Sequence, residues 1–203
     1  MKTNKTKDCT KKTEKSLKNL LLALEEQFKN HLKAFYSNLD IQKNIIDSIW
    51  VISQRFLILT RGAICVRPYP KEQSDREERE MRSDFKIQKD NLTNLNLKLD
   101  VSLETLKQKC RTFDRTLANI DTSLPNQTIE GNNERQPIHY YIELFADCLK
   151  FFKATQSQLS PLGRFLNVED IKSIVECKKL LEPDEMVMEY FEKSICEPVN
   201  RHL

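Results

Sequence analysis

The chain has 203 residues, of which 31% are charged and only three are glycine. Sheets and tight turns need more glycine and more β-branched runs than this, so the composition excludes a β-rich fold and indicates amphipathic helices. The formal net charge of +3 hides an uneven distribution, because the first 18 residues alone hold seven lysines against Asp8 and Glu14.

The first 16 residues are basic, rich in threonine and poor in apolar side chains. This composition is typical of a disordered tail, because the segment cannot bury enough surface to offset the entropy lost on ordering. The alternative is contact with an acidic partner, through Lys2, Lys5, Lys7, Lys11, Lys12 and Lys15. Since no apolar signal-peptide core occurs in this segment, the sequence predicts an intracellular protein, cytoplasmic or nuclear.

Two apolar stretches follow, at residues 17–39 and 41–66, and each repeats its apolar residues at steps of three and four. This spacing predicts two amphipathic helices, separated at Asn38-Leu39-Asp40, the only turn or cap signal between them. The second stretch is apolar on most of its faces, which makes a membrane span the alternative. Ser53 and Arg55 interrupt it too early for a span, so we expect a buried helix and no transmembrane segment.

The strongest pattern in the sequence lies between Met81 and Leu124, where apolar residues again recur at steps of four and three. One extra step of four near Leu99 predicts a stutter, which locally relaxes the supercoil. Ser74-Asp75-Arg76-Glu77 has the form of a capping box and predicts the start of this helix, and Pro125 predicts its end. A helix over about 74–124 would be roughly 75 Å long.

The polar residues 125–137 form the best linker in the chain, because they contain a glycine, two prolines and several asparagines. Beyond them, the apolar spacing predicts a well-buried helix from Ile138 to Leu159. Asn167 predicts the cap of a short helix, with Asp170 near its positive end. Glu182-Pro183-Asp184-Glu185 then predicts the start of a final short helix.

These elements together predict an all-α fold, an elongated helical bundle or coiled coil with one long central helix and shorter flanking helices. We expect a basic disordered tail at 1–16, a coiled-coil hairpin region at 17–124, the linker at 125–137 and a C-terminal helical region at 138–203.

No pattern in the sequence indicates catalysis. The six cysteines are scattered singly and the three histidines lie far apart, so neither type of residue has metal-ligand spacing. There is no glycine-rich phosphate loop and no nucleophile elbow. We therefore predict no catalytic, cofactor-binding or metal site, and a protein that is not an enzyme. His31 lies on the apolar face, or seam, of the helix predicted at 17–39. There it would be either a pH-sensitive or register-setting contact or simply a packed histidine.

The length of the predicted central helix suggests a function. Its apolar seam is longer than the helices at 17–39 and 41–66 can cover, unless these two stack end to end along it. Other helical subunits, or a second copy of the chain, would then cover the remainder. The candidate interface residues are Leu92, Leu95, Leu99, Leu103, Leu106, Phe113 and Leu117. On this interpretation the protein is a scaffold, a structural subunit or adaptor of a larger helical assembly.

Two other functions stay open. A self-contained helical bundle could present a groove to a peptide or a lipid surface, provided that residues 17–66 fold back on the long helix and residues 138–195 fill the other side. Alternatively, the basic tail could tether nucleic acid or another acidic surface. Nucleic acid is the minor alternative, because no aromatic residues lie among the lysines and the rest of the chain is slightly acidic.

Overall fold

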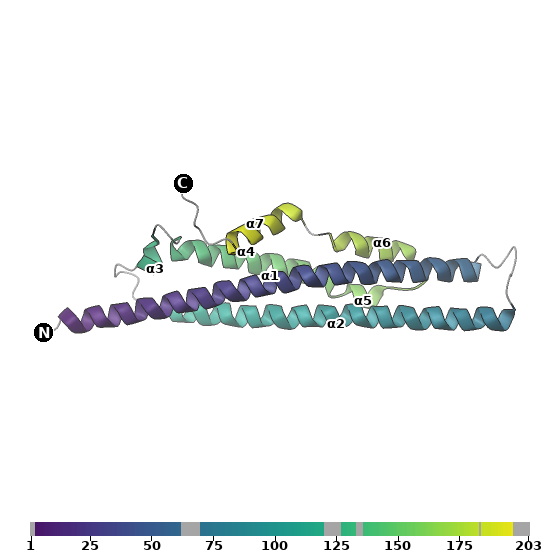
Figure 1. Ribbon diagram of the computed structural model, residues 1–203, viewed down its shortest axis with the longest axis horizontal. Helices are drawn as coiled ribbons and strands as arrows, with labels where there is room; N and C mark the ends of the chain where they lie inside the picture. The colour runs from purple at the N-terminus through teal and green to yellow at the C-terminus, as the bar shows by residue number, and fades with distance from the viewer. Residues whose placement is uncertain (1–2, 62–69, 120–126, 133–135, 183, 197–203) are drawn as a thin grey trace. The chain divides into compact units, whose positions relative to one another are not determined.

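The computed structural model describes residues 3–61, 70–119, 127–132, 136–182 and 184–196, with side chains for all of these except 3–14, 127, 128 and 196. All seven elements in this part of the chain are α-helices, which confirms the all-α helical bundle (Figure 1). They are α1 (Thr3–Arg61), α2 (Lys71–Ala118), α3 (Gln127–Glu130), α4 (Ile138–Leu159), α5 (Leu162–Phe165), α6 (Ile171–Leu180) and α7 (Glu185–Cys196).

The helices form two compact units. Unit 1 contains Met1–Ala34, Val101–Lys153 and Asp184–Leu203, and unit 2 contains Phe35–Asp100 and Ala154–Pro183. Three helices, α1, α2 and α4, continue from one unit into the other. The units therefore do not follow the order of the sequence.

Helix α1 is a single helix of 59 residues, so the predicted break at Asn38-Leu39-Asp40 is wrong. The side chain of Asn38 does not cap a helix end. Its Nδ2 donates to the backbone oxygen of Leu95 at 3.0 Å, and its Oδ1 accepts from Nε2 of Gln42, one turn further along α1. Leu39 is buried as well. Because Asn38 has hydrogen-bond partners and Leu39 is buried while both stay in the helix, no turn is needed here.

The structure assigns helix from Thr3, whereas composition predicts disorder for residues 1–16. No glycine or proline interrupts this segment, and extending an existing helix needs no new nucleus. Leu17 and Leu21, which follow the segment, are both buried and hold the adjoining turns of the helix in place.

Helix α2 begins at Lys71, three residues before the predicted capping box. The backbone oxygen of Pro70 accepts from the amides of Gln73 and Ser74, both at 3.1 Å, so Ser74 already lies inside the first turn. The helix ends at Ala118. The predicted end at residue 124 lies outside the described residues, as do residues 125, 126 and 133–135 of the predicted linker. The described part of that linker contains the short helix α3.

The seam of α2 is regular, so the predicted stutter near Leu99 is wrong. Asn96 is 2% exposed and takes the seam position that the apolar pattern gave to Leu95, which is half-buried. The buried residues then follow one another at steps of four and three: Leu92, Asn96, Leu99, Leu103, Leu106, Cys110 and Phe113. The error arose because an asparagine was not counted as a core residue.

Unit 1 is held together by aromatic contacts. Phe28 of α1 stacks on Phe145 of α4, with ring centroids 4.4 Å apart and planes inclined by 7°. Phe151 of α4 meets Phe191 of α7 at 5.3 Å, which fixes α7 beside α4. Contacts between aromatic rings add to the stability that burial of their apolar surface already gives.

Unit 2 joins α5 and α6 to the two long helices. Nζ of Lys89 on α2 donates to the backbone oxygens of Arg164 and Leu166 at 3.2 and 3.1 Å, at the end of α5. Nζ of Lys178 on α6 pairs with Asp47 on α1 at 2.6 Å. Because the residues of this pair are about half exposed, we expect it to orient α6 more than to stabilise it.

The predictions for the C-terminal helices were mostly correct. Asp170, rather than Asn167, caps α6 by accepting from the amide of Ser173 at 3.2 Å. Asp184 accepts from the amides of Met186 and Val187 at the start of α7, close to the predicted restart. The short helix α5 was not predicted.

Candidate functional site

The predicted interface residues lie in the seam that α2 turns towards the rest of the chain. Leu92, Leu99, Leu103, Leu106 and Phe113 are buried, while Leu95 and Leu117 are half-buried. With α1 divided into two short helices, part of the apolar face of α2 was expected to lack a packing partner. A continuous α1 together with α4 covers the buried leucines within one chain, so their burial does not require a second molecule.

The lysines of the predicted basic tail are only partly described. Lys2 lies outside the described residues, and the side chains of Lys5, Lys7, Lys11 and Lys12 are likewise not described. Lys15 is exposed on α1.

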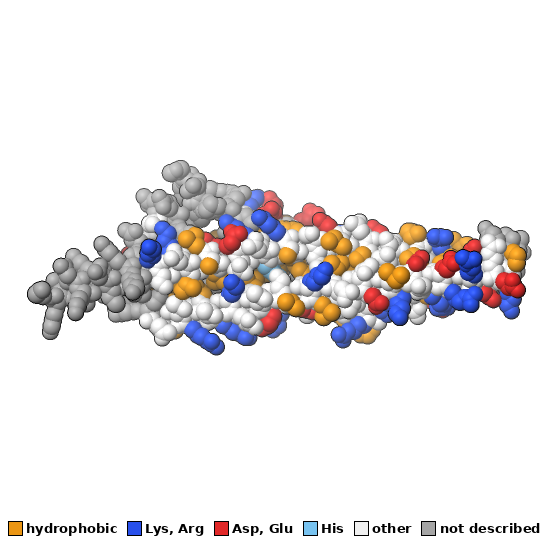
Figure 2. Space-filling view, turned by 60° about the horizontal axis from the view of Figure 1, so that its bottom comes forward, with side chains coloured by type: hydrophobic (Ala, Val, Ile, Leu, Met, Phe, Trp, Pro, Cys, Tyr) orange, Lys and Arg blue, Asp and Glu red, His pale blue; other side chains and the backbone are white. Residues whose placement is uncertain are grey.

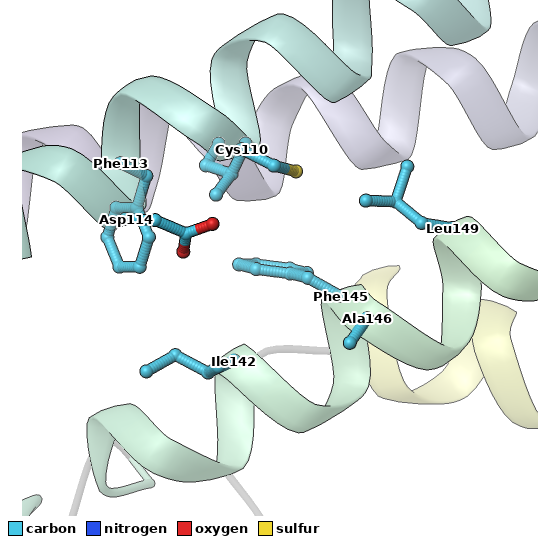
Figure 3. Close-up of a pocket in the computed structure, with 8 residues that line it drawn as sticks. Cys110, Phe113, Asp114, Ile142, Phe145, Ala146 and Leu149 are labelled. Atoms are coloured by element: carbon cyan, nitrogen blue, oxygen red, sulfur yellow. The ribbon is translucent and has the colours of Figure 1, made fainter.

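An apolar groove lies between α2 and α4 in unit 1 (Figure 3). Cys110, Phe113 and Asp114 line it from α2, and Leu24 of α1 lines it as well. The residues from α4 are Ile142, Phe145, Ala146 and Leu149. The groove has a volume of about 100 Å³. This is well below the roughly 300–1,000 Å³ of ordinary small-molecule sites, so the groove suits a single side chain of a larger partner.

The rim of this groove carries a negative charge. Asp114 is exposed, and within the described residues it has no ion-pair partner. Figure 3 shows its carboxylate on the α2 side of the cavity, across from Ile142 and Phe145 of α4. Ala146 is exposed on the opposite wall, while Ile142 and Leu149 are half-buried. An accessible apolar surface beside a carboxylate favours a partner that offers an apolar anchor and a positive charge.

The cysteine thiols near this groove have low reactivity. Burial, with a smaller contribution from Asp114, raises the pKa of Cys110 to about 12. Burial also raises the pKa of Cys148, with further contributions from Asp147 and Cys110. Both are free thiols, as is the buried Cys177. Because the thiolate is the reactive form, these cysteines are poor nucleophiles near neutral pH.

A second, polar cavity lies between α1 and α2 in unit 1. It measures about 190 Å³ and is lined by Gln27, Asn30, His31, Ser102, Thr105 and Leu106. Nδ1 of His31 lies 2.7 Å from the hydroxyl oxygen of Ser102, and its ring meets Phe152 edge-on at 4.5 Å. Burial lowers the pKa of His31 to about 4, so the imidazole is neutral at pH 7.

A neutral histidine beside a serine invites comparison with a nucleophile and its base. Ser102 lies in the middle of α2, where backbone amides bond within the helix and are not free to stabilise an oxyanion. The pair therefore fits the packed-histidine alternative, in which the polar edge of His31 meets a partner. Its register-setting role stays a prediction.

The described residues contain neither a metal-binding cluster nor a membrane-spanning helix. No group of three or more His, Cys, Asp or Glu residues in this part of the chain could hold a metal ion. No described helix is long and apolar enough to cross a membrane.

Exposed apolar side chains outside the groove are scattered. On the face shown in Figure 2 they lie among polar atoms and charges of both signs. The most exposed of them, Met186 and Phe165, belong to different units. Single exposed apolar residues are normal on protein surfaces, so they indicate a site less clearly than the groove does.

Comparison with known proteins gives no family for this chain. No protein-family model matches it, and neither the curated proteins nor the solved structures include a match. The function is therefore inferred from the geometry alone.

Sequence reasoning missed both the α2–α4 groove and the buried amides of unit 2. The groove needs residues from helices that lie about 30 positions apart, and their periodicity alone does not say which faces meet. The helix from Ile138 to Leu159 was predicted to be well buried, and Phe145 and Cys148 on it are buried. The predicted burial of this helix was the only feature of the sequence that pointed towards the groove.

Proposed function

We propose that the protein is a non-enzymatic structural subunit or adaptor of a larger helical assembly, and that it binds a helical segment of its partner in the α2–α4 groove. The observation that carries this proposal is the apolar groove lined by Phe113 and Phe145, with Asp114 exposed at its rim. The predicted leucine interface no longer supports the proposal, because most of those leucines are core residues of the chain itself.

The chemistry of the groove indicates which class of partner it can bind. Binding of an amphipathic helix in an apolar groove is a common mode of recognition, in which one face of the helix supplies the anchors. A volume of about 100 Å³ accommodates one aliphatic anchor. A lysine or arginine one turn from this anchor would meet Asp114, as residues three or four apart share a helix face. The same carboxylate disfavours an anionic lipid surface.

Arginine substitution of Ala146 tests this proposal, because the exposed Ala146 can be enlarged without filling the core. Native affinity purification of the full chain, with quantitative mass spectrometry, would compare wild type with Ala146→Arg and Asp114→Lys. We expect one or more partners to be lost at least tenfold in both variants. The matched control is Ala34→Arg, at an exposed alanine of α1 in the same unit, which should retain those partners.

Direct binding must then be shown with a purified partner. A partner peptide that contains the expected anchor and basic residue should bind wild type and bind Asp114→Lys at least tenfold more weakly. The proposal fails if partners are retained by both groove variants while circular dichroism shows that the variants are folded. Vesicle flotation with anionic lipids distinguishes binding of a partner helix from binding of a lipid surface. The membrane alternative predicts stronger flotation of Asp114→Lys.

A second candidate function is the tethering of nucleic acid or another acidic surface through the lysines of residues 1–16. The basic composition of this segment supports it, and Lys15 is exposed. Deletion of residues 1–16 should then weaken binding to polyanions at low salt, with a salt dependence set by the number of lysines in contact. Unchanged binding by the shortened chain would eliminate this candidate.

We further infer an intracellular location, cytoplasmic or nuclear. The buried free thiols Cys110, Cys148 and Cys177 support it, since proteins in oxidising compartments more often pair their cysteines.

A further inference from the structure

A cluster of four amide side chains lies in the core of unit 2. Gln42, Asn96, Gln156 and Asn38 are 0%, 2%, 4% and 7% exposed. They come from three helices, with Asn38 and Gln42 on α1, Asn96 on α2 and Gln156 on α4. We call them the amide cluster. Buried amides are unfavourable unless they are hydrogen-bonded, so their partners decide what the cluster does.

The hydrogen bonds of the amide cluster connect the three helices. Nε2 of Gln42 donates to Oδ1 of Asn38 at 2.5 Å and to Oδ1 of Asn96 at 2.9 Å. Nδ2 of Asn96 donates to the backbone oxygen of Leu159 at 2.9 Å. Nε2 of Gln156 donates in return to the backbone oxygen of Asn96 at 3.1 Å. Oε1 of Gln42 has no partner among the described residues.

The contact with Leu159 depends on the end of a helix. Leu159 is the last residue of α4, and the last four carbonyls of a helix have no partner inside it. A helix that continued past this level would already use that carbonyl for its own backbone. Asn96 therefore meets a carbonyl that has no competing backbone donor, three residues after Gln156, whereas Gln156 and Asn38 bond to carbonyls inside α2.

An apolar helix in the same position would satisfy the amide cluster less well, because it would bring neither the side-chain donor of Gln156 nor a carbonyl that is free of an intrahelical bond. Nδ2 of Asn96 would lose the free carbonyl of Leu159, and a complete loss of its hydrogen bond corresponds to roughly a 5- to 150-fold change in an equilibrium constant. Single buried polar residues fix register and oligomeric state in coiled coils by the same physics. A second copy of the chain could place an apolar helix face at this position, such as Leu99 to Phe113 of its α2. That face has no helix end beside Asn96.

We propose that the amide cluster selects the end of α4 as the third helix of unit 2, and that it excludes an apolar helix from a second copy of the chain. The cluster thus disfavours self-association in which an apolar helix of a second copy takes the place of the end of α4. This inference does not depend on the proposed function, because the α2–α4 groove belongs to unit 1.

The test removes the amide cluster without changing side-chain size greatly. The variant Gln42→Leu/Asn96→Leu/Gln156→Leu of the full chain would be mixed as unlabelled and ¹⁵N-labelled copies and measured by native mass spectrometry. We expect dimers of mixed mass at least tenfold more abundant than in wild type, with a thermal midpoint that is equal or higher. Ser53→Ala is the matched control: it removes a buried hydroxyl without a partner, outside the cluster, and should form no additional dimer.

A single variant tests the same contact if the triple variant does not fold. Asn96→Leu removes the donor to Leu159 but leaves Gln42 bonded to Asn38. Amide hydrogen exchange in the last turn of α4 should then become at least tenfold faster. The proposal is overturned if the triple variant folds and forms no more mixed dimer than wild type, or if exchange in this turn is unchanged by Asn96→Leu.

Discussion

Gly163 approaches Thr93 so closely that a Cβ atom on the glycine would lie 2.5 Å from the threonine hydroxyl oxygen. The other nearest atoms to this position, the backbone oxygen of Lys89 and the amide nitrogen of Thr93, are both at 3.5 Å, which is ordinary contact. A single hydroxyl group therefore restricts residue 163 to glycine and sets how closely α5 approaches α2.

The first prediction follows from this contact. Gly163→Ala should destabilise the protein by about 1–3 kcal/mol, as overpacking does in a closely packed interior. Thr93→Ala should relieve the clash, so the double variant should recover most of the loss. Urea unfolding of the four members of this cycle measures the coupling. Additive effects of the two substitutions would contradict the contact.

Acid should destabilise the protein through His31. Its pKa is lowered from 6.5 to about 4 by burial, so the folded state binds fewer protons than the unfolded state between these values. Stability from the neutral imidazole is complete above about pH 6.5 and declines as the pH falls towards 4, by about 3 kcal/mol in total. The check is the free energy of unfolding of wild type and His31→Gln between pH 4 and 7. Parallel curves for the two proteins would disprove this role for His31.

Cys110 should react slowly in the folded protein. With a pKa raised to about 12, its thiolate is roughly a thousandfold rarer at pH 8 than that of an ordinary cysteine. We expect its alkylation by iodoacetamide, followed by peptide mass spectrometry, to be at least about a hundredfold slower than in the urea-unfolded chain. Comparable rates in the two states would mean that the groove exposes this sulfur.

The stacked pair Phe28 and Phe145 should contribute much of the stability of unit 1. Phe145→Ala removes a ring that is 4% exposed and should cost about 3–5 kcal/mol of unfolding free energy. Ala146→Arg, one residue further but exposed, should change stability by less than about 0.5 kcal/mol. Thermal or urea unfolding distinguishes the two. Similar losses in both variants would show that Ala146 is not on the surface, and would also invalidate its use in the binding test.

The sequence predicted the helices better than it predicted their boundaries. The spacing of large apolar residues identified the seams of α2 and α4, because Leu, Phe and Ile occupy most of the buried positions. It failed where a polar residue takes a core position. Gln42, Asn96 and Gln156 look like surface residues, and only their partners on other helices make their burial favourable.

The same limitation explains the errors in α1 and in the candidate site. Asn38 resembles a cap, and nothing within the local sequence reveals that its amide bonds to the backbone of α2. The α2–α4 groove likewise depends on which faces of two helices meet, and periodicity leaves that undetermined. Local patterns thus predicted the faces of the helices, whereas the contacts between helices determined the site.

The interleaved segments of the two units have a consequence for synthesis on the ribosome. Unit 2 lacks its last segment until residues Ala154–Pro183 have emerged, and unit 1 lacks its last segment until Asp184 and the residues after it follow. Neither unit is complete while α1 and α2 are being made, so the faces of these helices that α4 covers stay exposed until α4 has emerged. The nascent chain should accordingly expose these apolar faces to chaperones until residues 154–183 have emerged.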